Sequence, residues 1–239
     1  MIHTAKHIIL VHGAWHDGWC WHRLVPELER YGHQVRAPDL PIEGSFGDCV
    51  EAVVAELDQC DSPALVVGHS LGGAFITQAA ESRPDAVARL VYLAAFLPGD
   101  GQSVNALGRE NIASALRGHV APDDEGRMMI DRDVARAAFY ADCDDDVVSA
   151  AIERLRPMNP SSFGAKLALS ESAFGRCALQ YIECIEDQAV HVSLQRKMAV
   201  EAGCTHINSM RTSHSPFLSA PAELAGLIAL SGPPPHGSH

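Results

Sequence analysis

The sequence predicts an α/β protein with a mostly parallel sheet and helices on both faces. Short apolar runs alternate with longer amphipathic stretches, the connections between them are short, and the alternation resumes after one long interruption. Strand–helix–strand repeats of this kind fold with right-handed crossovers, so the strands lie parallel and the helices cover both faces. A chain of 239 residues can form such a sheet within one domain.

Strands and helices alternate clearly in the first part of the chain. The expected strands are His7–Val11, Gln34–Pro38, Ala64–Gly68 and Arg89–Ala95. Most of their residues are apolar, as expected where helices cover both faces of a sheet. Helices are expected at Trp21–Tyr31, after Ser45 and at Leu71–Ser82. Ser45 with Asp48 three residues later resembles a capping box, which starts a helix.

Residues 98–175 interrupt this alternation. They contain several helical stretches without a convincing strand, and they are too long for a simple connection. We therefore expect a helical cap over one end of a core formed by residues 1–97 and 176–232, followed by a disordered Pro/Gly-rich tail at 233–239. The remaining core elements are expected at Ala178–Cys184 (strand), Val192–Glu201 (helix), Cys204–Met210 (strand) and Ala222–Leu230 (helix).

Charge and hydropathy exclude several classes of partner. The chain has 18 Lys and Arg against 30 Asp and Glu, a formal charge of −12. A surface this acidic repels nucleic acid backbones and anionic lipids, so neither nucleic acid nor membrane is expected as a partner. The sequence also lacks an apolar run of about 18 residues, the length of a membrane-spanning helix.

The cysteines and histidines suggest neither disulfides nor a metal. The seven cysteines are scattered without a C-x-x-C pair and are interpreted as buried thiols of a reducing compartment. With no signal-peptide pattern, a cytoplasmic location is expected. His12 and His16 are four residues apart, but Gly13 and Gly18 place them in a loop, and no H-E-x-x-H motif is present. No metal site is expected.

The strongest chemical signal is Gly68-His69-Ser70-Leu71-Gly72, which matches G-x-S-x-G. It lies directly after an apolar strand and directly before a helix, the context that the motif requires. The sharp turn forces the serine into a strained conformation, and glycines on either side remove the clashes that side chains would cause. Ser70 is therefore predicted to be a nucleophile exposed above the sheet.

A second signal follows the first strand. Acyl transfer needs two N–H donors that face a developing oxyanion. One is expected from Leu71, next to the nucleophile, and the other from the loop His12-Gly13-Ala14-Trp15. We assign the donors to the backbone N–H groups of Ala14 and Leu71. Without the serine motif, the same loop would be interpreted as a glycine-permitted turn.

A serine nucleophile requires a base and an acid, which follow it in the order acid, then histidine. His214 lies in a loop after the last expected strand and is preferred to His206, which alternates within that strand. Asp187 follows the strand Ala178–Cys184 and precedes His214 by 27 residues, room for one helix and one strand. Glu186 is a close competitor for the acid, and Asp100 is a more distant one.

Several segments together resemble the plant-type methylesterase and hydroxynitrile lyase group of α/β-hydrolases. They are HGAWHDGWCW, GHQVRAPDL, GHSLGG, VYLAAFLPGDGQS, YIECIEDQAV and SHSPFLSAP. The resemblance is weakest in Arg109–Ala151. It implies an α/β-hydrolase core with a helical cap, no cofactor, commonly a homodimer, and an acyl pocket between sheet and cap. Ser70, Asp187 and His214 match the family's triad, and Ala14 and Leu71 match its oxyanion donors.

Two positions distinguish the branches of that family. Its S-selective cyanohydrin-cleaving members have a Thr after the first-loop histidine and a Lys after the catalytic histidine, and another branch has an Asn at the first of these positions. Here the positions hold Gly13 and Ser215. Without a cation beside His214, nothing obvious stabilises a cyanide leaving group, so the resemblance favours an esterase over a lyase.

The expected substrate is a small-molecule ester with a small or aromatic acyl group, such as a methyl ester or a lactone. The candidate substrate contacts are Gly13, Trp15, His16, Phe139 and Phe163. Any single aromatic of the cap is more often a core residue than a substrate contact. The alternatives are a hydroxynitrile lyase, a C–C hydrolase with the same triad, and a receptor that keeps the fold without catalysis.

Overall fold

The computed structural model describes residues 6–230. A six-stranded, all-parallel sheet with the order β2-β1-β3-β4-β7-β8 lies at its centre. The strands are β1 (His7–Val11), β2 (Gln34–Arg36), β3 (Ala64–His69), β4 (Val87–Leu93), β7 (Leu179–Cys184) and β8 (His206–Met210). The predicted parallel sheet is confirmed, and every predicted strand is present with its bounds shifted by at most two residues.

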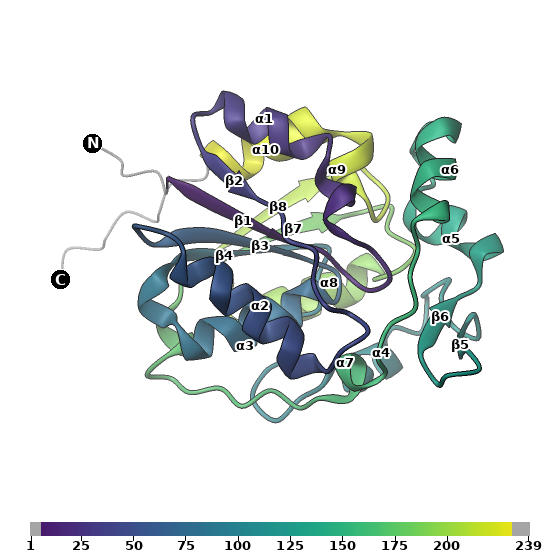
Figure 1. The fold of residues 1–239 in the computed structure, drawn as a ribbon, viewed down its shortest axis with the longest axis horizontal. Coiled ribbons are helices and arrows are strands. Elements are labelled where there is room, and N and C mark those ends of the chain that lie inside the picture. Colours follow the sequence, from purple (N-terminus) through teal and green to yellow (C-terminus); the bar gives the residue numbers. More distant parts are fainter. Residues whose placement is uncertain (1–5, 231–239) are drawn as a thin grey trace.

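Helices cover both faces of the sheet. Figure 1 shows α1 (Leu24–Arg30) and α10 (Pro221–Leu230) on one face, and α2 (Phe46–Asp58) and α3 (Gly72–Ser82) on the other. Helix α8 (Val192–Glu201) packs against β7. Residues 8–11 of β1 are completely buried, and burying each such Ile, Leu or Val contributes about 1.5–3 kcal/mol to folding.

Local sequence explains how two of these helices begin. The capping box expected at α2 is present: the Ser45 N–H donates to Asp48 Oδ2 (2.7 Å), and the Asp48 N–H donates to Ser45 Oγ (3.2 Å). The helix expected at Trp21–Tyr31 is instead a 3₁₀ turn at Gly18–Trp21 followed by α1. The 3₁₀ turn forms because the Asp17 carboxylate accepts the Trp19 N–H (3.1 Å).

The cap differs from the wholly helical expectation. Its helices are α4 (Val104–Glu110), α5 (Arg132–Phe139), α6 (Asp145–Glu153) and α7 (Ser161–Gly164). Between α4 and α5, however, β5 (Val120–Pro122) and β6 (Met128–Ile130) form an antiparallel hairpin. Strands of three residues are too short to show an alternating pattern in sequence. Figure 1 shows the hairpin, α5 and α6 beyond the carboxyl ends of the central strands.

The remaining elements are short connections, namely the 3₁₀ turns Pro84–Ala86 and Phe174–Arg176 and the helix α9 (Pro216–Ser219).

All seven cysteines are free, but only Cys20, Cys49 and Cys184 are fully buried. The other four are half-buried, so the expectation of buried thiols is wrong for them. Within the described residues no helix is both long and apolar enough to cross a membrane. The tail expected at 233–239 lies outside the described residues.

Candidate active site

Ser70 lies in the tight turn that joins β3 to α3, as the G-x-S-x-G motif predicts. Its φ angle is +54°, a left-handed conformation that is uncommon for residues other than glycine. Such strain persists only where the surroundings enforce it. Here the Ser70 N–H donates to the Leu93 carbonyl (3.3 Å), and the Ser70 carbonyl accepts the N–H groups of Gly73 (3.1 Å) and Phe96 (2.9 Å).

Close packing at this turn leaves no room for side chains at the neighbouring glycines. A Cβ on Gly68 would lie 2.8 Å from the Gly72 carbonyl oxygen, and one on Gly72 would lie 2.6 Å from the Val11 carbonyl oxygen. Both distances are shorter than a Cβ contact tolerates. The glycines of the motif therefore let α3 approach β1 and β3 closely enough to form the turn.

The loop after β1 lies against the serine. A Cβ on Gly13 would be only 2.8 Å from the Cβ of Ser70. Ala14 and Leu71 line one cavity together with Ser70. Within residues 6–230 the backbone N–H groups of Ala14 and Leu71 donate to no protein acceptor. Two free N–H groups beside the serine match the predicted oxyanion donors.

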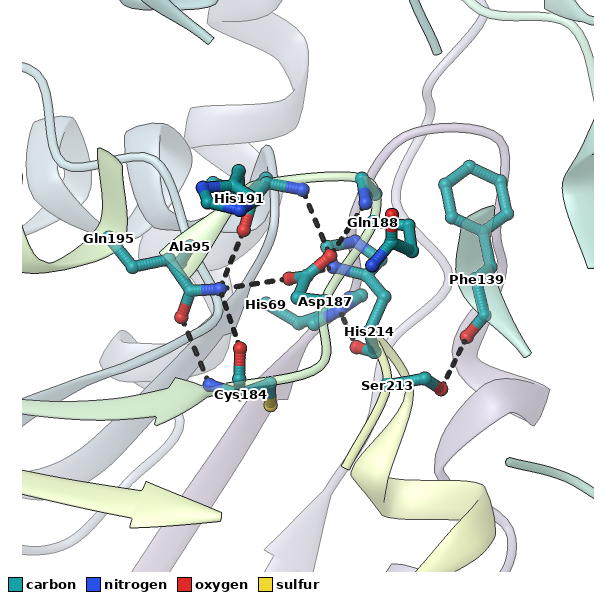
Figure 2. A network of polar contacts seen from close by, with 12 residues as sticks. His69, Ala95, Phe139, Cys184, Asp187, Gln188, His191, Gln195, Ser213 and His214 are labelled. Atoms are coloured by element: carbon teal, nitrogen blue, oxygen red, sulfur yellow. Dashed lines mark hydrogen bonds and ion pairs between the residues drawn. The ribbon is translucent and has the colours of Figure 1, made fainter. Parts of the chain in front are cut away.

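His214 and Asp187 form a buried pair. His214 Nδ1 lies 2.7 Å from Asp187 Oδ2, and both side chains are at most 1% exposed. The other carboxylate oxygen of Asp187 accepts the N–H groups of Ala189 (2.7 Å) and Val190 (3.0 Å). Figure 2 shows this carboxylate surrounded by donors on both sides. Asp187 is thereby fixed with one oxygen directed at His214.

The competing residues lie elsewhere. Glu186 pairs with Arg211 (2.9 Å), and its side chain is 48% exposed. The carboxylate of Asp100 accepts the Leu169 N–H (2.8 Å). His206 begins β8 and contacts Thr205 (3.2 Å). Of the acids and bases considered from the sequence, the structure brings only Asp187 and His214 together.

Gln195 is a part of the site that sequence reasoning missed. Its amide nitrogen lies 3.0 Å from Asp187 Oδ2 and 2.6 Å from the Val190 carbonyl oxygen. Its amide oxygen accepts the Cys184 N–H (3.1 Å), so it ties Asp187 to the end of β7 (Figure 2). Gln195 is completely buried on α8 among apolar residues. A polar residue on the apolar face of a predicted helix was the available signal.

Three further histidines near the site are buried. Burial lowers the pKa of His12 and of His16 to about 4, and it lowers the pKa of His69 well below its usual range. His12 donates from Nδ1 to the Gly13 carbonyl (2.9 Å) and accepts the Leu40 N–H at Nε2 (3.0 Å), which requires one neutral tautomer. His69 Nε2 lies 2.9 Å from the His214 carbonyl oxygen and donates to it.

The acid-rich segment 140–146 (YADCDDD) of the cap reaches the loop of His214. One carboxylate oxygen of Asp142 accepts the Ser213 N–H (2.9 Å), and the other accepts the Ser213 hydroxyl. The Phe139 ring, also from the cap, lies 5.5 Å from the His214 ring between centroids. The cap therefore helps to position the histidine.

A cavity of about 410 Å³ opens beside Ser70. Of the residues expected to contact substrate, Trp15 and Phe163 line it. Gly13, His16 and Phe139 are not among its lining residues. His16 is buried behind the loop, where its ring nitrogens contact the Ala14 carbonyl and the Tyr140 hydroxyl, both at 2.7 Å.

Trp15 connects loop 12–15, the oxyanion loop, to the cap. Its φ angle is +63°, which is strained for a bulky residue. Its indole N–H donates to the Met128 carbonyl of the cap hairpin (3.0 Å).

Within residues 6–230 no group of three or more His, Cys, Asp or Glu side chains is arranged to hold a metal ion.

Comparison with known proteins identifies the family. A family model described as the alpha/beta hydrolase family matches residues 8–227. The chain belongs to the alpha/beta hydrolase family. This hydrolase is 31% identical to the pyrethroid hydrolase of Sphingobium wenxiniae over 95% of this chain and 87% of that protein.

A plant relative and a solved structure agree with this assignment. Methylesterase 7 of Arabidopsis thaliana is 28% identical over 94% of this chain and 95% of that protein. The crystal structure of a pyrethroid hydrolase from Sphingobium faniae JZ-2 superimposes with a TM-score of 0.86 at 29% identity, covering 95% of this chain and 96% of that one. The predicted fold and the predicted likeness to methylesterases are confirmed.

Proposed function

We propose that this chain is a serine esterase that cleaves carboxylic esters through an acyl-enzyme on Ser70. The observation that supports this most directly is the shared location of the groups required. The strained serine and two free backbone N–H groups border one cavity, and the buried His214–Asp187 pair lies in the neighbouring loops. Relatives named as a methylesterase and a pyrethroid hydrolase support an ester as the substrate class.

The proposed reaction has two steps. Ser70 Oγ attacks the ester carbonyl while His214 Nε2 takes the hydroxyl proton, and the N–H groups of Ala14 and Leu71 stabilise the oxyanion. The tetrahedral intermediate collapses, and the alcohol leaves with the proton from His214. Water then attacks the acyl-enzyme and loses a proton to His214. The bond between the acyl group and Ser70 Oγ breaks, Oγ takes the proton back from His214, and the acid is released.

Asp187 has two roles in this scheme. Its carboxylate accepts the Nδ1 proton of His214, which leaves Nε2 free to act as a base, and it stabilises the imidazolium that forms in each step. Its remaining oxygen is already bonded by two backbone N–H groups. The carboxylate therefore does not need to reorganise during the reaction.

The substrate proposed is a small or aromatic acyl ester, with methyl esters and lactones as the first candidates. The cavity is lined largely by apolar side chains, including Trp15, Phe96 and Phe163. A cavity of about 410 Å³ falls in the range of small-molecule sites. Gly13 lacks the hydroxyl of the threonine that cyanohydrin-cleaving relatives have at this position, and Ser215 lacks the positive charge of their lysine. We therefore expect no cyanide release from mandelonitrile.

The test is the hydrolysis of p-nitrophenyl acetate by the wild type and by Ser70→Ala. We expect the variant to lose about 10⁴-fold or more in kcat while its melting temperature stays close to that of the wild type. Ser82→Ala is the matched control and should retain activity, because Ser82 is the last residue of α3, the helix that begins just after Ser70. Full activity in Ser70→Ala would overturn the proposal, and failure of the wild type to cleave any ester would favour a receptor.

A homodimer is also proposed from the family resemblance, and a cytoplasmic location from the seven free cysteines. Light scattering on the purified protein tests whether it is a homodimer. A monomeric mass across micromolar concentrations would contradict it.

A further inference from the structure

The charge of the cavity is opposite to that of the molecule. The whole chain has a formal charge of −12. The cavity beside Ser70 is lined by two arginines, Arg109 and Arg117, and by no aspartate or glutamate of the described residues. A cleft lined by charge of one sign focuses the field and attracts ligands of the opposite sign.

These two arginines are also unneutralised. Most of the chain's 18 Lys and Arg side chains form an ion pair or a hydrogen bond. Within residues 6–230, the side chains without one are those of Arg109, Arg117, Arg132 and Lys166. Two of these four therefore line a single cavity, although the chain contains 30 acidic residues that could have paired with them. Glu110, next to Arg109, pairs instead with Lys197.

The two arginines are more exposed than the cavity residues next to Ser70. Arg109 is at the end of α4 and Arg117 is in the segment that leads to β5, and both are exposed. Ala14 and Leu71, next to Ser70 in the same cavity, are at most 5% exposed. A ligand bound with its ester at Ser70 would share the cavity with apolar residues such as Val104 and Leu116 and with the two exposed arginines.

We propose that the site selects esters with a second, ionised acid group, a carboxylate, at the end remote from the bond that is cleaved. Guanidinium groups match the planar geometry of a carboxylate and can bind it through paired hydrogen bonds. Asn105 also lines the cavity, and its side-chain amide forms no hydrogen bond within the described residues, so it is available as a further donor. This inference rests on the proposed esterase function and narrows its substrate class.

The test compares two p-nitrophenyl esters of equal length, the half-ester of suberic acid and the ester of its monoamide. The half-ester carries a terminal carboxylate, and the other a neutral amide of the same shape. For the wild type we expect kcat/KM to be about tenfold higher for the half-ester, the size expected of two partly exposed ion pairs. The preference should fall in 0.5 M NaCl because salt screens such pairs.

The variants compared are Arg109→Gln/Arg117→Gln and Arg132→Gln/Lys166→Gln. Both remove two unpaired cations and change the formal charge from −12 to −14, but only the first pair lines the cavity. We expect the tenfold ratio to fall to about one in the first double variant and to persist in the second. A ratio of one in the wild type, or a ratio that survives in the first variant, would overturn the proposal.

Binding to Ser70→Ala separates this proposal from the proposed function. Calorimetry with the same two esters measures the charge preference without turnover. Tighter binding of the half-ester supports the proposal even if the wild type cleaves neither compound, a result that would refute the esterase function alone. Equal binding of both esters by Ser70→Ala would refute the charge preference alone.

Discussion

Gly13 sets the distance between the oxyanion loop and the serine. The Cβ that a Gly13→Ala substitution adds would lie 2.8 Å from the Ser70 Cβ and 3.1 Å from the His69 carbonyl oxygen. The second of these is a backbone atom of the strained turn and cannot move away cheaply. Either the loop or the serine must shift, and both belong to the proposed catalytic machinery.

We therefore predict that Gly13→Ala lowers kcat/KM for p-nitrophenyl acetate at least tenfold and destabilises the fold by about 1–3 kcal/mol. Steady-state kinetics and urea unfolding measure the two effects. Gly226→Ala in α10 is the control, because its added Cβ meets only the Tyr31 hydroxyl at 3.6 Å. Wild-type kinetics in Gly13→Ala would show that the loop does not need this close approach.

At the scale of secondary structure elements, the cap and the core meet at the histidine. The segment between α5 and α6 contributes Asp142, whose carboxylate binds both the N–H and the hydroxyl of Ser213. Ser213 directly precedes His214, so this carboxylate, together with the Phe139 ring, lets the cap act on the orientation of the proposed base. Asp144 in the same acidic segment forms no side-chain hydrogen bond within the described residues.

Asp142→Ala should lower kcat by about tenfold or more while KM changes less, because a mispositioned base affects the chemical step more than binding. Stopped assays with p-nitrophenyl acetate over a range of concentrations separate the two constants. Asp144→Ala should behave as the wild type. A change in KM alone in Asp142→Ala would contradict a role of Asp142 in positioning His214.

The elements of the core were predictable, and the contacts of the cap were not. The strands and the serine turn follow from local patterns, namely apolar runs and the glycines around Ser70. Asp187 and His214 were accessible because each follows a predicted strand in a known chain order. The hairpin at β5 and β6 has three-residue strands, Asp142 contacts Ser213, 71 residues away, and Arg117 shares a cavity with Ser70 only because of the fold. Local periodicity has no signal for such contacts.

At the scale of the whole molecule, buried neutral histidines make stability depend on pH. The folded pKa of His12 and of His16 is about 4, below the value of 6.5 for an exposed histidine. Between these values the unfolded chain binds more protons than the folded one, so stability rises with pH and is lost on acidification. The lowered pKa of His69 acts in the same direction.

We predict that the free energy of unfolding falls between pH 7 and pH 5 by about 2 kcal/mol for each of His12 and His16. Urea unfolding at the two pH values measures the change. His12→Asn should reduce the difference between the two pH values, whatever its effect at pH 7, because one titrating group is removed. Equal stability at pH 7 and pH 5 would contradict the burial of neutral imidazoles.

Labelling by a fluorophosphonate, followed by peptide mapping, tests the central claim most directly. Such probes react with a serine only where a base activates its hydroxyl and an oxyanion site receives the phosphonyl oxygen. We predict one label per chain, on the peptide that contains Ser70, and its loss in His214→Ala. No label on the folded wild-type protein, or a label on another serine, would contradict the assignment of Ser70 as the nucleophile.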